Sequence, residues 1–312
     1  MNPIKEIKTD ENGKKFTANS FLNRLRSSNP FWWNDRETVS EWVFRGQWDS
    51  EWTLTPTAWR DNNPKLQPLL HKISKLPSPK SPAEPIIDDE LEYFKRINTE
   101  YQAIIDFCKL AEDLGFEFPE VSNGPLQNGF LINSDGVVNL QNHTFIAQHH
   151  GIPTRLLDWS KNPLVASYFA VGSEFRANYK PKSVCVWALN TNRFKNIHAV
   201  KYKDKFLSPN ILKEVNFKSD YIKAQQGLFS NINSDGVKLF FLNEGRFPSL
   251  EDVLNLIEEE KKKEQPILYK FILPIEEVDD FLLLLDRENI SQAHLMPNLD
   301  KVSETVISRW KY

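Results

Sequence analysis

Three short segments of this chain place polar or charged side chains inside apolar sequence, where binding and catalytic groups are expected. The first, residues 42–47, is an apolar strand that ends in Arg45 and Gly46. The planar guanidinium of Arg45 suits a phosphate or carboxylate held through two hydrogen bonds, and glycine lets the backbone approach a ligand closely. The alternative is an Arg45 that is paired with an internal carboxylate. The segment therefore predicts either an anion-binding group or a structural ion pair.

The second segment, residues 147–160, is the richest in hydrogen-bonding and titratable side chains. His149 and His150 are adjacent, so they cannot both face one side of a helix, and at most one points into a pocket. Arg155 and Asp158 either serve a site or pair with each other and fix the loop. The two histidines and Asp158 lack the i, i+4 ligand pair of helical metal sites, so no metal is expected here.

The third segment, residues 221–229, carries paired amides, Gln225 and Gln226, directly before Gly227. Amide side chains inside apolar sequence indicate hydrogen bonding near a surface that the backbone approaches closely. The chain contains no Gly-rich phosphate loop, no Gly-x-Ser-x-Gly, no His-Glu-x-x-His and no Cys-x-x-Cys. These absences remove support for the common nucleotide-triphosphatase, serine hydrolase and zinc protease chemistries.

The elements that must position these segments follow from hydrophobic periodicity. Apolar residues at three- and four-residue spacing predict a helix over 91–108, a short helix spans 142–150, and Ser249 with Asp252 forms a capping box that begins another. Strands are predicted at 41–44, 183–189, 237–242 and 267–273, and loop insertions near 61–87 and 116–140. The fold class is α+β, a single core of mixed or antiparallel sheet with flanking helices. Residues 1–30 are expected to form a polar N-terminal arm and residues 31–312 the domain. The expected core anchors are Trp42, Phe44, Trp159, Phe169 and Trp187.

Composition bounds the class of protein. The 312 residues are 40% hydrophobic and 26% charged, which is ordinary globular usage. The formal net charge of −3 gives no global basic field for nucleic acid or anionic lipid, although residues 201–205 are locally basic. Cys108 and Cys185 are too few for a disulfide framework, and neither a signal peptide nor a membrane-spanning run is present, so we expect a cytoplasmic protein without a membrane partner.

The three segments together resemble the FRG domain family, named for the Phe/Tyr-Arg-Gly motif that stands here as residues 44–46, with Gln47 following. The most specific match is residues 148–159 with the Ala166–Ala170 helix, where the family usually has an aromatic residue in place of His150. Residues 224–229 match a third motif, and residues 294–300 resemble the family's Leu-Phe-Pro-Asp-Leu-Asp with Met296 and Asn298 substituted. The resemblance covers about residues 38–305.

The order of these motifs is also similar to that of the ADP-ribosyltransferase fold. This resemblance implies a cofactor-binding set for NAD as substrate, in which Arg45 grips the phosphates or the nicotinamide ribose. That set is Phe44, Arg45, Gly46, Gln47, Thr154, Arg155, Ser160 and Gln225. Gln226 is counted among the catalytic residues because it lies in the third motif, where a transferase would show Glu and this chain has Gly227. Asp158 is then expected to supply the missing carboxylate, and His149 to act as general base on the acceptor.

These observations leave three functional hypotheses. The first is an ADP-ribosyltransferase-like toxin or anti-phage defence effector that modifies a protein or nucleic-acid acceptor, with single-stranded RNA or DNA included because bases stack on aromatic residues. A toxin also implies a neutralising partner, such as an antitoxin. The second is a metal-dependent nuclease that uses His149, His150 and Asp158. The third is a non-catalytic module that binds a nucleotide or a partner through the Arg45 pocket.

Overall fold

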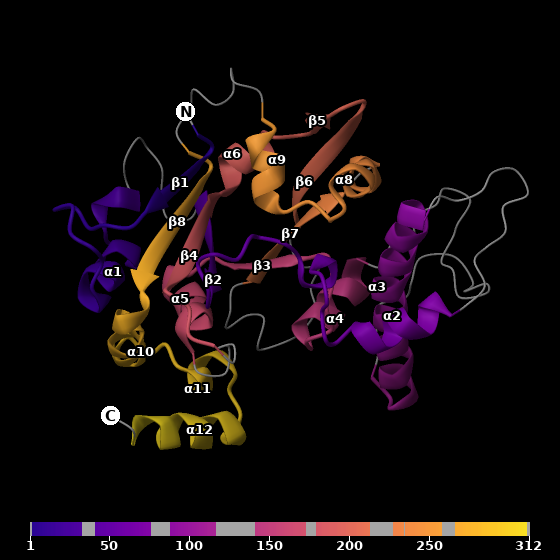
Figure 1. Ribbon diagram of the computed structural model, residues 1–312. Coiled ribbons are helices and arrows are strands. Elements are labelled where there is room, and N and C mark those ends of the chain that lie inside the picture. The colour runs from indigo at the N-terminus through magenta and orange to yellow at the C-terminus, as the bar shows by residue number, and fades with distance from the viewer. Residues whose placement is uncertain are drawn as a thin grey trace, which may run out of the picture.

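The fold is α+β, built on one mixed eight-stranded sheet with helices on both faces (Figure 1), as the sequence predicted. The computed structural model describes residues 2–32, 41–75, 88–116, 141–172, 179–212, 227–233, 235–257 and 266–310. The strand order is β1-β8-β4-β2-β3-β7-β6-β5, in which β1 pairs with β8 in parallel and every other neighbouring pair is antiparallel. The strands are β1 (Ile4–Ile7), β2 (Trp42–Gln47), β3 (Leu157–Ser160), β4 (Ser183–Asn190), β5 (Val200–Tyr202), β6 (Lys205–Leu212), β7 (Gly227–Asn233) and β8 (Leu268–Pro274).

The helices gather in separate groups around this sheet. In Figure 1, α2, α3 and α4 lie together on one side, and α10, α11 and α12 lie together near α5. None of the helices that the structure describes is both long and apolar enough to cross a membrane. The helices are α1 (Ala18–Leu25), α2 (Gln67–Ser74), α3 (Asp88–Asp113), α4 (Gln141–His149), α5 (Pro163–Val171), α6 (Thr191–Lys195), α8 (Gly236–Glu244), α9 (Leu250–Asn255), α10 (Val278–Arg287), α11 (Gln292–Leu295) and α12 (Leu299–Arg309), with short 3-10 turns η3 (Thr57–Trp59) and η6 (Ile275–Glu277).

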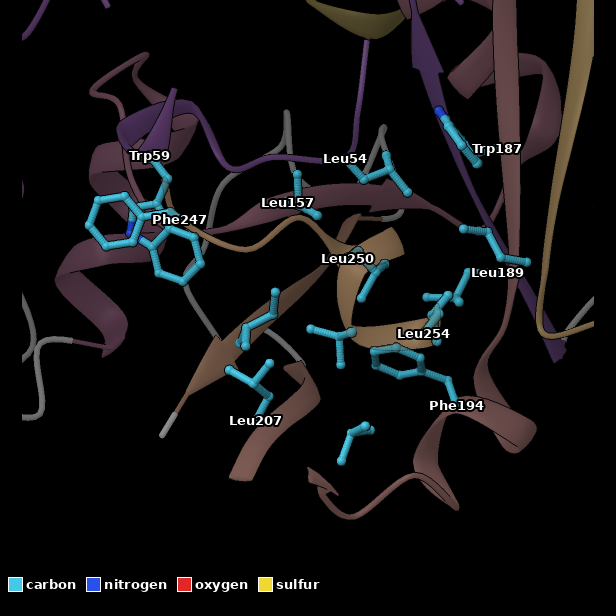
Figure 2. Packing of buried hydrophobic residues seen from close by; sticks show 14 of the residues in the cluster. Leu54, Trp59, Leu157, Trp187, Leu189, Phe194, Leu207, Phe247, Leu250 and Leu254 are labelled. Atoms are coloured by element: carbon cyan, nitrogen blue, oxygen red, sulfur yellow. The ribbon is translucent and has the colours of Figure 1, made fainter. Parts of the chain in front are cut away.

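Period-two alternation along the central strands produces a core on each face of the sheet. In β2, Trp42 and Phe44 join the cluster under α1, α5 and α10, whereas Val43 joins the cluster under α8 and α9. Figure 2 shows the second cluster, where Leu250 and Leu254 of α9 pack among side chains from the sheet. Of the expected core anchors, Trp42, Phe44, Trp159 and Trp187 are at most 2% exposed, while Phe169 is only partly buried.

The N-terminal residues are part of the domain, so the expected polar arm over residues 1–30 is wrong. Strand β1 pairs with β8, and the described residues of that segment include Phe16, Phe21 and Leu25, which are at most 1% exposed. The charged residues of this segment alternate with apolar residues that face the core. Thr17 and Ser20 form a capping box that begins α1.

Two further expectations differ from the structure. Residues 237–242 form helix α8 instead of a strand, because a short apolar run does not distinguish a buried helix from a buried strand. Gly245, with φ 68°, ends α8 in the left-handed conformation that glycine favours. Within the loop expected at 61–87, residues 67–74 form α2; residues 76–87 and 117–140 lie outside the described parts of the chain. The predicted helices at 91–108 and 142–150 and the capping box at Ser249 are confirmed.

Gly46 is required by the packing of α5 on β2. A Cβ atom at this position would lie 2.0 Å from the carbonyl oxygen of Ala166 and 2.6 Å from the backbone nitrogen of Ala170. Both atoms belong to the backbone of α5, so they cannot move aside as a flexible side chain would. Gly46 therefore serves helix packing, in addition to any approach to a ligand.

Gly46→Ala is expected to lower the free energy of unfolding by at least about 2–3 kcal/mol, because the added methyl forces α5 away from the sheet. Urea unfolding followed by circular dichroism measures this. Gly227→Ala is the matched control, since a Cβ there meets no atom within 4 Å and its stability should stay within about 1 kcal/mol of wild type. Equal effects of the two substitutions would contradict the packing explanation.

Candidate functional site

A cleft of about 630 Å³ opens where β2, β3 and β7 meet α4, α5 and the start of α12. These three strands are neighbours in the sheet although they come from distant parts of the chain. The volume lies within the usual range for small-molecule and cofactor sites. The lining residues are Phe44, Arg45, Gly46, Gln148, His149, His150, Asp158, Trp159, Ser160, Ala166, Phe169, Gly227, Leu228, Phe229, Met296, Asn298 and Lys301.

Arg45 of β2 and Asp158 of β3 form an ion pair next to the single point where these two strands are paired. β2 and β3 share a single pairing, Phe44 with Ser160. Beyond it, Arg45 Nη1 donates to the Asp158 carbonyl oxygen at 3.0 Å and to its carboxylate Oδ2 at 3.1 Å. The Arg45 side chain is 14% exposed and that of Asp158 is 52% exposed. Arg45 is therefore ion-paired, and the carboxylate that pairs with it faces the cleft.

A second group of hydrogen bonds holds the same carboxylate from α4. Gln148 Nε2 donates to Asp158 Oδ1 at 2.9 Å and to Oδ2 at 3.0 Å. Thr154 Oγ1 donates to Gln148 Oε1 at 2.6 Å. Thr154 was expected to bind the cofactor; it is fully buried and is not among the residues that line the cleft, and its hydroxyl is joined to the site through Gln148.

Two arginines, Arg45 and Arg60, lie near the Asp158 carboxylate. Arg60, which follows η3, lies close enough to the ion pair for the charges of Arg45 and Asp158 to shift its pKa. Burial first, and the charge of Arg45 second, lower the pKa of Arg60 to about 10, while Asp158 acts in the opposite direction. Arg60 remains protonated at neutral pH, so two guanidinium groups accompany one carboxylate. This arrangement favours an anionic ligand in the cleft.

His149 and His150 occupy the end of α4 at the cleft and differ in their surroundings. His150 is exposed, and its ring stacks on Phe107 of α3 at 5.9 Å between centroids. His149 is partly buried; burial, and then the neighbouring His150, lower the pKa of His149 below its usual value of about 6.5, while Asp158 opposes the shift. His149 is consequently a neutral imidazole at neutral pH and is able to accept a proton.

The lowered pKa of His149 predicts how stability depends on pH. Between about pH 6.5 and the lower folded-state pKa, the unfolded chain binds a proton that the folded chain does not, so the free energy of unfolding falls as pH drops through this window. His149→Gln removes this contribution, and urea unfolding at pH 7.5, 6.5 and 5.5 should give a shallower decline than wild type. Burial lowers the pKa of His143 as well, so some slope persists in the variant. Identical slopes in the two proteins would contradict the assignment.

Two residues expected to bind a cofactor, Phe44 and Gln47, have buried side chains, although Phe44 also borders the cleft. Phe44 is 0% exposed, and its ring lies 5.2 Å from that of Trp32. Gln47 is buried, donates to the Thr53 carbonyl and accepts a hydrogen bond from Trp187 Nε1 at 2.7 Å. Because side chains alternate along a strand, Gln47 and Trp187 both lie under the α9 face of the sheet. Ser160, by contrast, does line the cleft.

Arg155 also lies away from the cleft and does not pair with Asp158. Its backbone nitrogen donates to Glu100 Oε1 at 2.7 Å, and its Nε donates to Oε1 at 3.0 Å and to Oε2 at 3.1 Å. Its guanidinium packs over the ring of Tyr101 at 4.6 Å. Burial alone would lower the pKa of Arg155, but Glu100 and then Tyr101 raise it overall. Arg155, which was expected to bind the cofactor, thus forms contacts that join α3 to the loop before β3.

Sequence reasoning missed the C-terminal wall of the cleft. Met296, Asn298 and Lys301 line it, and Asn298 caps α12 by accepting from the backbone nitrogen of Lys301. Lys301 Nζ contacts both carboxylate oxygens of Glu304. The available signal was the resemblance of residues 294–300 to a family motif, which carried no assigned role.

Three further expectations concern Gln225 and Gln226, a metal site, and the basic segment 201–205. Gln225 and Gln226 lie outside the described residues; Gly227, which follows them, begins β7 opposite Ser160. In the parts of the chain that the structure describes, no group of three His, Cys, Asp or Glu side chains is arranged to hold a metal ion. In the basic segment 201–205, Tyr202 is buried and its hydroxyl donates to Glu244 at 2.6 Å, so this ring does not offer a stacking surface.

Comparison with known proteins identifies the region around the cleft. Residues 127–179 match the family model described as the FRG domain. The match includes α4, β3 and α5, and with them Gln148, His149 and Asp158. It confirms the family resemblance drawn from the sequence over these residues. Neither a curated protein nor a solved structure matches the chain.

Proposed function

We propose that this chain, with its FRG domain match at residues 127–179, is an ADP-ribosyltransferase-like enzyme that uses NAD as a substrate. The acceptor is a protein or a nucleic acid, single-stranded RNA or DNA included. No metal is required in this proposal. The resemblance to toxin and anti-phage defence proteins further implies that a neutralising partner keeps the enzyme silent.

One observation carries the proposal: the three sequence segments that resemble the transferase motifs surround a single cleft. Arg45 lies in the first on β2, Asp158 lies in the second on β3, and Gly227 of the third begins β7. These strands are adjacent in the sheet, and α5 packs behind them. This is the arrangement that the motif order implies.

The donors of Arg45 suit an anionic dinucleotide. Both hydrogen bonds that Arg45 makes to Asp158 come from Nη1. In the described parts of the chain, Arg45 Nε is buried and has no hydrogen-bond partner. A guanidinium with unused donors, supported by the charge of Arg60, favours a diphosphate held through several charge-assisted hydrogen bonds.

The remaining groups have distinct roles. Transfer breaks the bond between the ribose and the nicotinamide nitrogen, whose electrons leave with the nicotinamide, and positive charge develops on the ribose. The Asp158 carboxylate stabilises that charge in a partly enclosed site. A lone pair of the acceptor forms the new bond to the ribose carbon, and neutral His149 takes the proton that the acceptor loses.

The test uses purified protein and NAD labelled on its adenylate, incubated with cell lysate with and without a chelator. We expect label in a fraction that protease, ribonuclease or deoxyribonuclease removes, and no effect of the chelator. Degradation of nucleic acid only when metal is present would favour the nuclease instead. Binding of NAD by calorimetry without transfer would favour the non-catalytic module, and absence of both would overturn the proposal.

A further inference from the structure

We propose that Gln148 is a positioning residue that holds the Asp158 carboxylate in the cleft, and that the Thr154 hydroxyl fixes the orientation of the Gln148 amide. The inference rests on the proposed function, because it assigns Gln148 to the carboxylate that stabilises the ribose. It also concerns contacts within the protein, which are measurable without any substrate.

The geometry of the amide is specific. Gln148 Nε2 reaches both oxygens of Asp158, at 2.9 and 3.0 Å, and Gln148 Oε1 accepts from Thr154 at 2.6 Å. If the amide turned over, Oε1 would face the carboxylate, and two acceptors would oppose each other. The carboxylate therefore excludes the reversed amide, and the Thr154 hydroxyl supports the orientation that presents NH₂ to Asp158 by donating to Gln148 Oε1.

Thr154 is itself immobile. It is 0% exposed, its Oγ1 accepts from the Leu156 backbone nitrogen at 3.2 Å, and its carbonyl accepts from Ala58 at 3.1 Å. Gly151, with φ 84°, turns the chain after α4 so that Thr154 returns to face Gln148. The Thr154 hydroxyl is therefore held in place opposite the last turn of α4, where it keeps the Gln148 amide in one position.

A neutral donor suits this position for an electrostatic reason. Arg45 also holds Asp158, but a cation cancels part of the negative charge that the developing ribose cation needs. When an anionic ligand draws Arg45 toward its phosphates, Gln148 remains on the carboxylate. Gln148 orients Asp158 without adding charge, so the full attraction stays available for the transition state.

The other polar groups near Asp158 do not replace Gln148. His149, His150 and Lys301 line the same cleft, and Arg60 lies close enough to Asp158 to be affected by its charge. Arg60 Nε donates to the Thr55 carbonyl, and Lys301 Nζ contacts Glu304. Among the described residues, hydrogen bonds to the Asp158 carboxylate come from Arg45 and Gln148.

The first arm of the experiment uses no substrate. In ¹⁵N-labelled protein, the side-chain NH₂ signal of Gln148 is assigned by its loss in Gln148→Leu. We expect Asp158→Asn and Thr154→Val each to shift this signal, and Thr154→Ser to leave it near its wild-type position. Thr99→Val is the matched control, because it removes an equally buried hydroxyl that donates to Lys95 on α3. An unshifted signal in both Asp158→Asn and Thr154→Val overturns the proposal.

The second arm measures NAD turnover and NAD binding. Gln148→Leu should lower kcat on the order of 10–100-fold, the usual effect of losing a hydrogen bond to a charged group, with the Kd for NAD changed less than about threefold. The same substitution in an Asp158→Asn background should have little further effect. Thr154→Val should lower kcat in the same direction, and Thr154→Ser should restore it.

The outcomes separate the two proposals. If wild-type protein shows no transfer, the proposed function fails while the NMR arm still decides whether Gln148 positions Asp158. If transfer occurs and Gln148→Leu loses as much kcat in the Asp158→Asn background as in wild type, the positioning role is overturned. If Gln148→Leu fails to fold, the pair Thr154→Val and Thr154→Ser decides alone: equal activities in these two variants overturn the proposal.

Discussion

Replacing Arg45 by Ala is expected to reduce ADP-ribose transfer at least about 100-fold while leaving the fold intact. Loss of two charge-assisted hydrogen bonds to a diphosphate costs on the order of 3 kcal/mol, which corresponds to about 100-fold in kcat/KM. The structural cost is small, because the ion pair with Asp158 is half open to solvent and Gln148 still holds the carboxylate. The measurement is labelled-NAD transfer together with the melting temperature of each protein.

A positive charge alone at position 45 should not restore transfer activity. Arg45→Lys retains a cation but not the planar fork, so we expect it to remain well below wild type. Arg246→Ala is the matched control: it removes an arginine that forms two hydrogen bonds with Asp252 outside the cleft, at 2.6 and 2.9 Å. Its transfer activity should equal that of wild type. An Arg45→Ala protein that melts far below wild type would instead show that the arginine serves mainly as a structural ion pair.

The sequence predicted the centre of the site better than its edges. Arg45, His149 and Asp158 were expected together, and the structure brings them to one cleft. That success has a local cause. His149 and Asp158 lie within ten residues of each other around one turn, and Arg45 ends a strand whose apolar pattern is unambiguous.

The edges of the site depend on contacts that join distant parts of the chain. Gln47 lies two residues after Arg45 and on the same face of β2, but its amide accepts a hydrogen bond from Trp187 on the neighbouring strand β4, a contact that sequence spacing does not reveal. Gly46 lines the cleft, but its close contact with the backbone of α5 is not visible in the sequence. The wall from Asn298 to Lys301 reaches the cleft only through the packing of the C-terminal helices.

Helices and strands with a regular local pattern were predicted, whereas those that depend on distant contacts were not. Helix α3 and strand β4 have long, regular patterns and were predicted. Strand β1 has four residues, and its partner β8 lies more than 250 residues later, so its place in the sheet depends on a pairing that no local pattern records. Helix α8 contains an unbroken apolar run at residues 239–242, and this run hides the amphipathic period that would have identified the helix.

The second large effect concerns stability, and it tests the structural role given to Arg155. Glu100 is 1% exposed and accepts three hydrogen bonds from Arg155. Arg155→Leu leaves that carboxylate buried with only the backbone donor, and Glu100→Leu leaves the guanidinium without its acceptor. Each substitution should lower the free energy of unfolding by about 3–5 kcal/mol, as expected for removal of one partner from a buried ion pair.

The double substitution Glu100→Leu/Arg155→Leu should recover much of this loss, because it buries no unpaired charge. The double variant should therefore lose much less free energy of unfolding than the two single variants lose together. Chemical denaturation of wild type, the two single variants and the double variant gives the coupling energy directly. The measurement also decides between the two roles proposed for Arg155. A cofactor ligand would leave the stability of Arg155→Leu near that of wild type and weaken NAD binding. A structural ion pair predicts the opposite result. The stability of Arg155→Leu falls, the double variant recovers much of it, and the double variant binds NAD in the Arg45 cleft as wild type does.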